Sequence, residues 1–542
     1  MMNSSTSTLS PVISTNGHTP LWIGPLNAVA FDEAGWRAHL RALDHPLYIV
    51  SDGARLGITH QPSTGSGESL ALLAATGPLR PSQLGSANFR SFYGLKYAYT
   101  GGAMANGIAS ADLVIALGQA QLMCSFGAAG LVASRIEAAL DRIQAALPDG
   151  PYAFNLIHSP NEQALERNAV ELYLKRGVKT VEASAFLALT PHIVRYRASG
   201  LRQAAGGAIE IGNRVIAKVS RREVATYFLE PAPASLLQPL VSQGLITEQQ
   251  AQLAQRVPMC DALTVEADSG GHTDNRPLVC LLPAMLELRD EICAKNNYQQ
   301  AVYVGGAGGI GTPSAALAAF MMGADYIVTG SVNQACVESG ASAHTRRILA
   351  QAGQADVMMA PAADMFEMGV KVQVLKKGTL FPVRAQKLYE LYKACDSLET
   401  IPVDEREKLE RQVFRKPLAT VWQETEAFFR ERDPEQLERA NQNPKRKMAL
   451  VFRWYLGLSS RWSNSGEPGR EMDYQVWCGP AMGAFNEWTQ NTALAAPENR
   501  HAAEVAEHIM QGAAYLYRIL QLRTQGLTLP AQLANYKPEP LA

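Results

Sequence analysis

Short apolar runs recur along the middle of the chain, separated by segments with apolar residues at helical spacing. Between residues 94 and 331, eight of these runs are expected to form buried strands: Lys96–Tyr99, Met123–Phe126, Tyr152–Ile157, Val178–Ala183, Arg214–Val219, Ala262–Glu266, Ala301–Val304 and Tyr326–Val328. Strands that alternate with helices form parallel sheets. The pattern therefore predicts an α/β fold, a (β/α)8 TIM barrel over residues 91–335.

The segments that flank the predicted barrel have other patterns. Residues 1–19 are polar and lack a basic start and an apolar core, which predicts a disordered tail rather than a signal peptide. Residues 20–90 combine short strand-like pieces with one helix and predict a small N-terminal α/β module. Residues 336–475 show helical spacing and no repeated strand signal, so we expect a helical domain inserted after strand eight. Residues 476–542 are expected to form C-terminal helices that complete the barrel.

Two turns of small residues follow the seventh and eighth predicted strands. Gly305–Gly311 precedes Thr312, a suitable helix N-cap, and Thr329-Gly330-Ser331 follows the next strand. The glycines match G-x-G-x-x-G, but a Rossmann unit would need an acidic residue at the end of its second strand. Adjacent small-residue turns fit the phosphate site after strands seven and eight of a (β/α)8 barrel. Two tight turns without a ligand are the alternative.

Polar side chains lie at or near the ends of four other predicted strands, where barrel active sites form. They are Asn155, Glu182, Lys218 and His272. A phosphate on Gly308, Gly309, Gly330 and Ser331, with Lys218 beside a ring and Asn155 at its edge, suits flavin mononucleotide (FMN). Gly270 and Gly271 bring His272 close to a ligand, where it is a candidate general acid or base. A structural histidine is the alternative.

Composition limits the other possibilities. The 542 residues carry a net charge of −1, which gives no reason to expect nucleic-acid binding. No run approaches the ~20 apolar residues of a membrane span. The seven cysteines are scattered without a C-x-x-C pair, which argues against a metal site and a disulfide framework and favours a reducing cytoplasm.

Several long motifs resemble one family. They are GGAMANGIASADLVIALG, PYAFNLIHSP, VEASAF, EADSGGHTDNRP, GGAGGIGTPSAALAAFMMGADYIVTGS, PAADMFEMGVKVQVLKKGTLFPVRA and KMALVFRWYLGLSSRW…WCGPAMGAFNEW. They resemble the PfaD family, the trans-acting enoyl reductases of polyunsaturated fatty acid and trans-acyltransferase polyketide synthases. That family lies within the nitronate monooxygenase-like group of flavin barrels. The resemblance runs from about residue 21 to residue 522.

The resemblance implies a bound FMN, NADPH as hydride donor and an enoyl thioester on acyl carrier protein as substrate. It places His272 at the active site and the phosphate on Ala307, Gly308, Gly309, Gly330 and Ser331. Ala103 and Met104 lie in the loop where the wider group has Ala-Pro-Met. Residues 336–475 would bind the substrate and the carrier protein, for which Arg446, Lys447, Arg453 and Arg461 are candidate contacts. A homodimer is a further expectation.

Three other interpretations remain open at this point. A nitronate monooxygenase would share the barrel and the flavin, with oxygen as the oxidant. A non-catalytic docking subunit of a synthase would not bind FMN. A barrel resembling inosine monophosphate dehydrogenase would need a nucleophilic cysteine near the phosphate turns, whereas Cys280 lies several residues past the glycines of Ser269–His272 in an apolar run.

Overall fold

A computed structural model describes residues 20–158 and 163–540. Eight parallel strands close into a barrel in the order β5-β6-β7-β8-β11-β12-β14-β15. Their bounds are β5 Tyr99–Gly101, β6 Met123–Phe126, β7 Ala153–Ile157, β8 Thr180–Ser184, β11 Arg214–Val219, β12 Ala262–Glu266, β14 Tyr303–Ala307 and β15 Tyr326–Thr329. The predicted TIM barrel is confirmed.

Strand β14 extends further than predicted, into the glycine-rich turn. Gly305 and Gly306 pair with β12 on one side and β15 on the other, so their backbone groups are bonded within the sheet. A Cβ on Gly305 would lie 2.4 Å from the ring of Tyr326. The aromatic ring fills the space that a side chain of Gly305 would occupy. Local strand propensity does not reveal this packing, so the end of the strand was not predicted.

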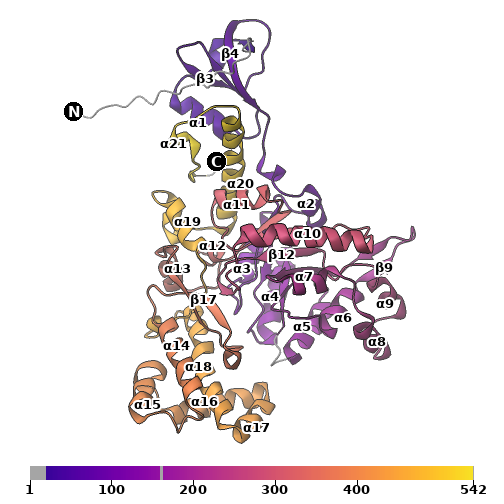
Figure 1. The fold of residues 1–542 in the computed structure, drawn as a ribbon, viewed down its shortest axis with the longest axis vertical. Coiled ribbons are helices and arrows are strands. Elements are labelled where there is room, and N and C mark those ends of the chain that lie inside the picture. Colours follow the sequence, from indigo (N-terminus) through magenta and orange to yellow (C-terminus); the bar gives the residue numbers. More distant parts are fainter. Residues whose placement is uncertain (1–19, 159–162, 541–542) are drawn as a thin grey trace, which may run out of the picture.

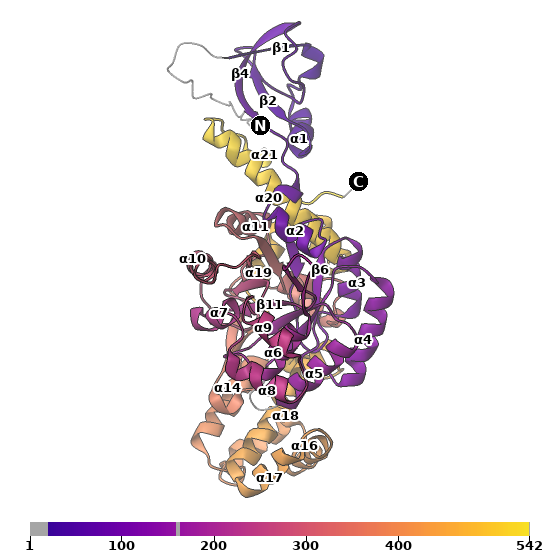
Figure 2. The ribbon, with the colours of Figure 1, turned by 90° about the vertical axis from the view of Figure 1, so that its right-hand side faces the viewer.

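Helices surround the barrel, and the last of them comes from the C-terminal end of the chain (Figures 1 and 2). Those that follow the strands are α3 Ala111–Gln119, α4 Ala133–Ala146, α5 Gln163–Lys175, α6 Pro191–Ser199, α7 Arg222–Leu229, α10 Leu278–Asn296 and α11 Pro313–Met321. Helix α20, Ala502–Thr524, packs against both α11 and α3. A Cβ on Gly512 would lie 2.4 Å from Pro313, so the glycine permits this close helix contact.

The N-terminal end of the barrel is closed by aromatic side chains. Helix α2, Ala87–Tyr93, places Phe89 in a stack on Tyr326 of β15, with ring centroids 4.2 Å apart. Phe89 also meets the edge of Tyr303 from β14. Phe89 and Tyr326 are fully buried, so this end is an apolar plug.

Residues 20–76 form the module at the top of Figure 2. Its four antiparallel strands have the order β1-β4-β2-β3. The elements are β1 Leu21–Gly24, α1 Glu33–Arg41, β2 Leu47–Ser51, β3 Leu56–Thr59 and β4 Glu68–Thr76. The buried guanidinium of Arg518 on α20 donates to carbonyls at the C-terminal end of α1, including Ala42 O at 3.1 Å. The predicted tail over residues 1–19 lies outside the described residues.

The segment after strand β15 contains a strand pair as well as helices. The segment is mainly helical, as predicted, but it also contains an antiparallel hairpin that the sequence analysis did not include, β16 Val357–Pro361 and β17 Lys371–Leu375. The helices are α12 Ser331–Gln334, α13 Ala343–Ala350, α14 Phe381–Ala394, α15 Val403–Leu409, α16 Leu418–Arg432, α17 Pro434–Gln442 and α18 Pro444–Ser465. Apart from α17, the elements from β16 onward contribute to a hydrophobic core of their own. Figure 1 shows them as the lower orange lobe.

The remaining elements are short. Between β8 and β12 lie the hairpin β9 Leu201–Gln203 and β10 Ile209–Ile211, and helices α8 Ala234–Ser242 and α9 Glu248–Ala254. Helix α19, Ala481–Thr489, and α21, Ala531–Ala534, belong to the C-terminal part. Within residues 20–158 and 163–540, no helix has the length and apolarity that a bilayer span requires. All seven cysteines are free thiols.

Candidate active site

The glycine turns after β14 and β15 are neighbours, because Ala307 pairs with Val328 in the sheet. Gly308 has φ +87°, and a Cβ there would lie 2.6 Å from the carbonyl carbon of Ala267. This position requires glycine. A Cβ on Gly309 or Gly330 would meet no other atom within 4 Å. The two turns therefore leave open space beside their backbone at the C-terminal end of the barrel.

Ser331 begins helix α12 beside these turns and has a structural partner. Its Oγ accepts a hydrogen bond of 3.1 Å from the N–H of Gly479. Gly479 in turn lies against Ser269 and Gly270, where an added Cβ would come within 2.9 Å of the Gly270 nitrogen. The loop that contains Gly479 thus joins the turn after β15 to the loop that carries His272.

A charged cluster lies at the same end of the barrel. Lys218 Nζ is 3.2 Å from Glu266 Oε1 and 3.9 Å from Glu182 Oε1. The Glu182 carboxylate also accepts from the N–H of Ala103 at 3.2 Å. Asn155 Nδ2 donates to the backbone oxygen of Glu182 at 3.1 Å. The structure therefore brings together four of the predicted residues and Glu266 at the end of β12. The four are Ala103, Asn155, Glu182 and Lys218.

Burial and mutual attraction set the charges in this cluster. Burial raises the pKa of Glu182, although the nearby ammonium of Lys218 opposes this shift. Burial by itself would lower the pKa of Lys218, but the carboxylates of Glu266 and Glu182 outweigh it and raise the pKa. Lys218 is therefore a fixed positive charge at neutral pH.

Met104 lies in the loop after β5, and its backbone is packed tightly. A Cβ on Gly127 would lie 1.8 Å from the Met104 carbonyl oxygen, so the loop rests on the chain after β6. The Met104 side chain is half-buried. In the same loop, Asn106 Nδ2 donates to Ser460 Oγ of α18 at 2.9 Å. The first barrel loop therefore contacts the inserted segment directly.

His272 is held between the barrel and the inserted hairpin. Gly271 and His272 form the short strand β13, which pairs antiparallel with β17. His272 Nε2 lies 3.2 Å from Asp364 Oδ1. Burial alone would lower the pKa of His272, but the hydrogen bond and charge of Asp364 outweigh it and raise the pKa. The same pairing lowers the pKa of Asp364 against the effect of its burial.

Gln373 of β17 fixes the loop that leads to His272. Its Nε2 donates to Asp268 Oδ1 at 2.7 Å and to the backbone oxygen of Ser269 at 2.8 Å. Its Oε1 accepts from Asn275 Nδ2 at 3.0 Å. Gln373 itself is buried, and its three hydrogen bonds are partly buried. Nearby, a Cβ on Gly270 would lie 2.8 Å from the nitrogen of Cys478, which restricts this position to glycine.

Sequence reasoning missed three site residues, Glu266, Asp364 and Gln373. A signal for Gln373 was present, because KVQVL at Lys371–Leu375 alternates apolar and polar residues as a strand does. Asp364 lies in the turn between β16 and β17, and its sequence neighbours do not show that His272 is near.

The four proposed basic contacts in the insertion do not form a common exposed patch. Arg446 donates to Gln436 at 2.5 Å, and Lys447 lies over the ring of Trp422. Arg453 pairs with Glu367 at 3.5 Å. Arg461 is exposed. Three of the four side chains therefore have roles within the insertion.

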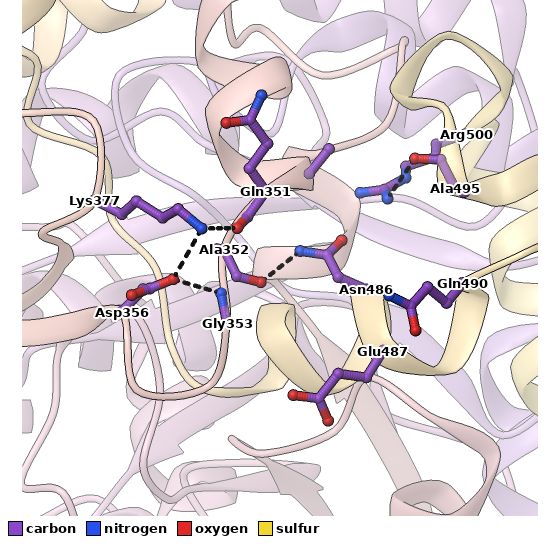
Figure 3. A pocket seen from close by; sticks show the side chains of 11 residues that line it. Gln351, Ala352, Gly353, Asp356, Lys377, Asn486, Glu487, Gln490, Ala495 and Arg500 are labelled. Carbon is purple, nitrogen blue, oxygen red and sulfur yellow. Dashed lines mark hydrogen bonds and ion pairs between the residues drawn. The ribbon is translucent and has the colours of Figure 1, made fainter.

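A cavity of about 360 Å³ lies away from the predicted site (Figure 3). It is lined by residues from the end of α13, from α19 and from the loop before β16, and an ion pair joins Lys377 and Asp356 at its side. None of the predicted site residues lines this cavity. The chemistry at the barrel end is therefore separate from it.

The fold and the site define a (β/α)8-barrel protein with two open glycine turns, a half-buried lysine and a histidine–carboxylate pair at the C-terminal end of the strands. The family model "Fatty acid synthase subunit PfaD N-terminal domain" matches residues 22–78. The model "[Acyl-carrier-protein] S-malonyltransferase, inserted helical domain" matches residues 395–474.

Similar proteins agree with these matches. The solved enoyl reductase domain of MlnA, from the macrolactin biosynthesis cluster of Bacillus amyloliquefaciens, is 39% identical with a TM-score of 0.78 and covers 82% of this chain and 99% of its own. A polyunsaturated fatty acid synthase component of Thraustochytrium is 48% identical over 93% of this chain and 34% of its own length. Polyketide biosynthesis protein PksE of Bacillus subtilis is 45% identical over 83% of this chain and 58% of its own.

The chain belongs to the family of PfaD-like enoyl reductases. It spans about a third of the Thraustochytrium protein and a little over half of PksE.

Proposed function

We propose that the chain is an FMN-dependent enoyl reductase that uses NADPH to reduce the 2,3 double bond of an enoyl thioester on acyl carrier protein. The observation that carries this proposal is the arrangement of open glycine turns, Lys218 and the His272–Asp364 pair around one end of the barrel. The relatives named as enoyl reductase and as synthase components support the assignment.

The residues at the barrel end fit FMN. The space beside Gly309 and Gly330 would hold the phosphate, which their backbone N–H groups can bind. Lys218 would stabilise negative charge on the ring system. Ala103, Met104 and Asn155 would line the remaining side of the site, and the Glu182 bond to Ala103 N–H fixes that loop. A bound flavin would accept hydride from NADPH and supply it to the β-carbon of the substrate.

His272 is proposed as the proton donor. Its Nε2 is engaged by Asp364, so Nδ1 is the nitrogen that remains for the substrate. A protonated ring carries hydrogen on both nitrogens, and the raised pKa keeps more of the ring in that form near neutral pH. Nδ1 would give its proton to the α-carbon. The Gly270–His272 backbone would stabilise negative charge on the thioester oxygen.

The inserted segment is proposed to contact the carrier protein and its acyl chain. It lies at the site through β17 and reaches the first barrel loop through Ser460. Since three of the four basic candidates are engaged within the insertion, Arg461 is the remaining candidate for an acidic carrier.

An anaerobic experiment tests the proposed function. The flavin is reduced with NADPH, a crotonyl thioester of pantetheine is added, and the absorbance is followed. Return of the oxidised spectrum is expected. If the flavin stays reduced until oxygen or a nitronate is admitted, the monooxygenase interpretation replaces this one. A protein that binds no flavin after reconstitution would fit the interpretation as a non-catalytic docking component.

Replacement His272→Ala is expected to slow reoxidation by the thioester about 10²–10⁴-fold, the usual contribution of a positioned acid. The FMN content should not change, because the phosphate turns are untouched. Stopped-flow absorbance measures the rate, and the flavin-to-protein ratio provides the control. An unchanged rate would remove His272 from the mechanism.

A further inference from the structure

We propose that Asp364, which the inserted segment supplies, positions the imidazole of His272 and stabilises its protonated form. The active site would then be complete only when the inserted hairpin is paired with the barrel loop. This inference rests on the proposed role of His272 in the reductase. It assigns a positioning residue to the inserted segment, which lies outside the eight strands of the barrel.

The contact joins two segments that are 92 residues apart. Asp364 lies in the turn between β16 and β17, and the sheet pairing of β17 with β13 brings that turn to His272. The carboxylate is itself oriented, because Oδ1 also accepts from the N–H of Met365 at 3.1 Å. A backbone N–H therefore helps to hold the oxygen that meets His272.

Several charged groups act on this pair. Glu266 favours the protonated ring of His272 and Lys218 opposes it, whereas Asp364 has the strongest effect among the charged neighbours. The positive charge of Arg453, which pairs with Glu367 at 3.5 Å, helps to lower the pKa of Asp364. The side chains of His272 and Asp364 are 36% and 40% exposed. The pair is therefore accessible to a substrate, and solvent moderates its electrostatic effect.

Gln373 explains why the hairpin holds a fixed position. It bonds to Asp268 and Ser269 in the loop that leads to His272, while its own backbone pairs with Gly271. The same hairpin thus supports both the loop and the carboxylate that contacts the ring. If the hairpin only supported the loop, the contacts of Gln373 would be enough, and the contact of Asp364 with the His272 ring would not be needed.

The measurement uses the whole 542-residue chain with its flavin bound and with [13Cε1]-labelled histidine. His272→Gln identifies the signal of His272 among the ten histidines. The pKa of His272 should fall by about one unit in Asp364→Asn, at the low end of the range for loss of a neighbouring opposite charge, because the pair is partly exposed. The pH profile of flavin reoxidation by the crotonyl thioester should move to lower pH by the same amount.

Glu367→Gln is the matched control, since this carboxylate lies three residues further along and faces Arg453. It should leave both the pKa and the pH profile unchanged. Asp364→Glu retains a carboxylate, so the pKa of His272 should stay closer to the parent value than in Asp364→Asn. This variant also keeps the inference testable if Asp364→Asn does not fold.

An unchanged pKa of His272 in folded Asp364→Asn would overturn the inference. A lower pKa in a protein that no enoyl thioester reoxidises would support the positioning role and contradict the proposed reductase function. The two failures are therefore distinguishable.

Discussion

The two ends of the barrel are built from the same eight strands and have opposite chemistry. At the N-terminal end, Phe89, Tyr303 and Tyr326 form a dry aromatic plug. At the C-terminal end, Glu182, Lys218 and Glu266 form a charged cluster beside turns that leave open space. The first end shows where burial stabilises the barrel, whereas the second places charge and open space where the active sites of such barrels form.

We expect the largest effect on stability at the N-terminal end of the barrel, where the aromatic plug lies. Phe89→Ala removes a fully buried ring that stacks on Tyr326, and we expect a loss of about 3–5 kcal/mol in the free energy of unfolding. Flavin affinity of the folded protein should change little, because the open end is untouched. Urea unfolding and flavin titration measure the two quantities. Phe92→Ala, at a half-buried ring of the same helix, is the milder control. Loss of flavin affinity in folded Phe89→Ala would contradict the separation of the two ends.

At the open end, Lys218→Met should cost stability and flavin affinity together. It leaves the carboxylates of Glu182 and Glu266 without their cation, and breaking such an arrangement costs about 3 kcal/mol. Flavin titration should show at least a tenfold weaker affinity, because the ring also loses the charge proposed to stabilise it.

The pH dependence of Lys218→Met has a defined sign. Without the ammonium, burial and the negative charge of Glu266 hold the pKa of Glu182 above its value in the unfolded chain. The folded variant therefore binds more protons, and its deficit against the parent should shrink as pH falls. The double variant Lys218→Met/Glu266→Gln should recover part of the loss. A deficit that grows toward acid pH would show that the carboxylates are not the cause.

A smaller effect is expected where the insertion meets the open end. Gln373→Ala leaves Asp268 and the Ser269 carbonyl without their donor, which should cost about 1–3 kcal/mol. Faster hydrogen exchange is expected over residues 268–275, with the remainder of the barrel unchanged. Gln354→Ala removes an exposed bond to Glu487 and serves as the control. Unchanged exchange in the His272 loop would mean that β17 does not hold it.

Much of the barrel could be predicted because the sequence patterns that indicate its strands and helices are local. Strands such as Met123–Phe126 and Ala262–Glu266 are short apolar runs between helical segments, and the structure has them at those bounds. Glu182 and Lys218 are polar residues in or near strand ends, and barrel topology alone brings such ends together. The structure places them as neighbours across the sheet.

The contacts of the insertion could not be predicted in the same way. Asp364 reaches His272 only through the pairing of β17 with β13, a strand of two residues that is too short to leave a periodic pattern. Gln373 looks in sequence like an exposed strand residue, yet it is buried against a loop more than a hundred residues away. Both positions depend on tertiary pairing rather than on local propensity.

The central claim, that the open end of the barrel holds a flavin, is tested most directly by the flavin content of Gly330→Leu. A Cβ at Gly330 meets no other atom within 4 Å, so the fold should accept the side chain while the proposed phosphate space is filled. Gly77→Leu is the control, at an exposed glycine in the N-terminal module with the same open surroundings. We predict that Gly330→Leu unfolds at the same temperature as the flavin-free parent and binds FMN at least tenfold more weakly, while Gly77→Leu binds it normally. Normal FMN binding by a folded Gly330→Leu protein would contradict the account.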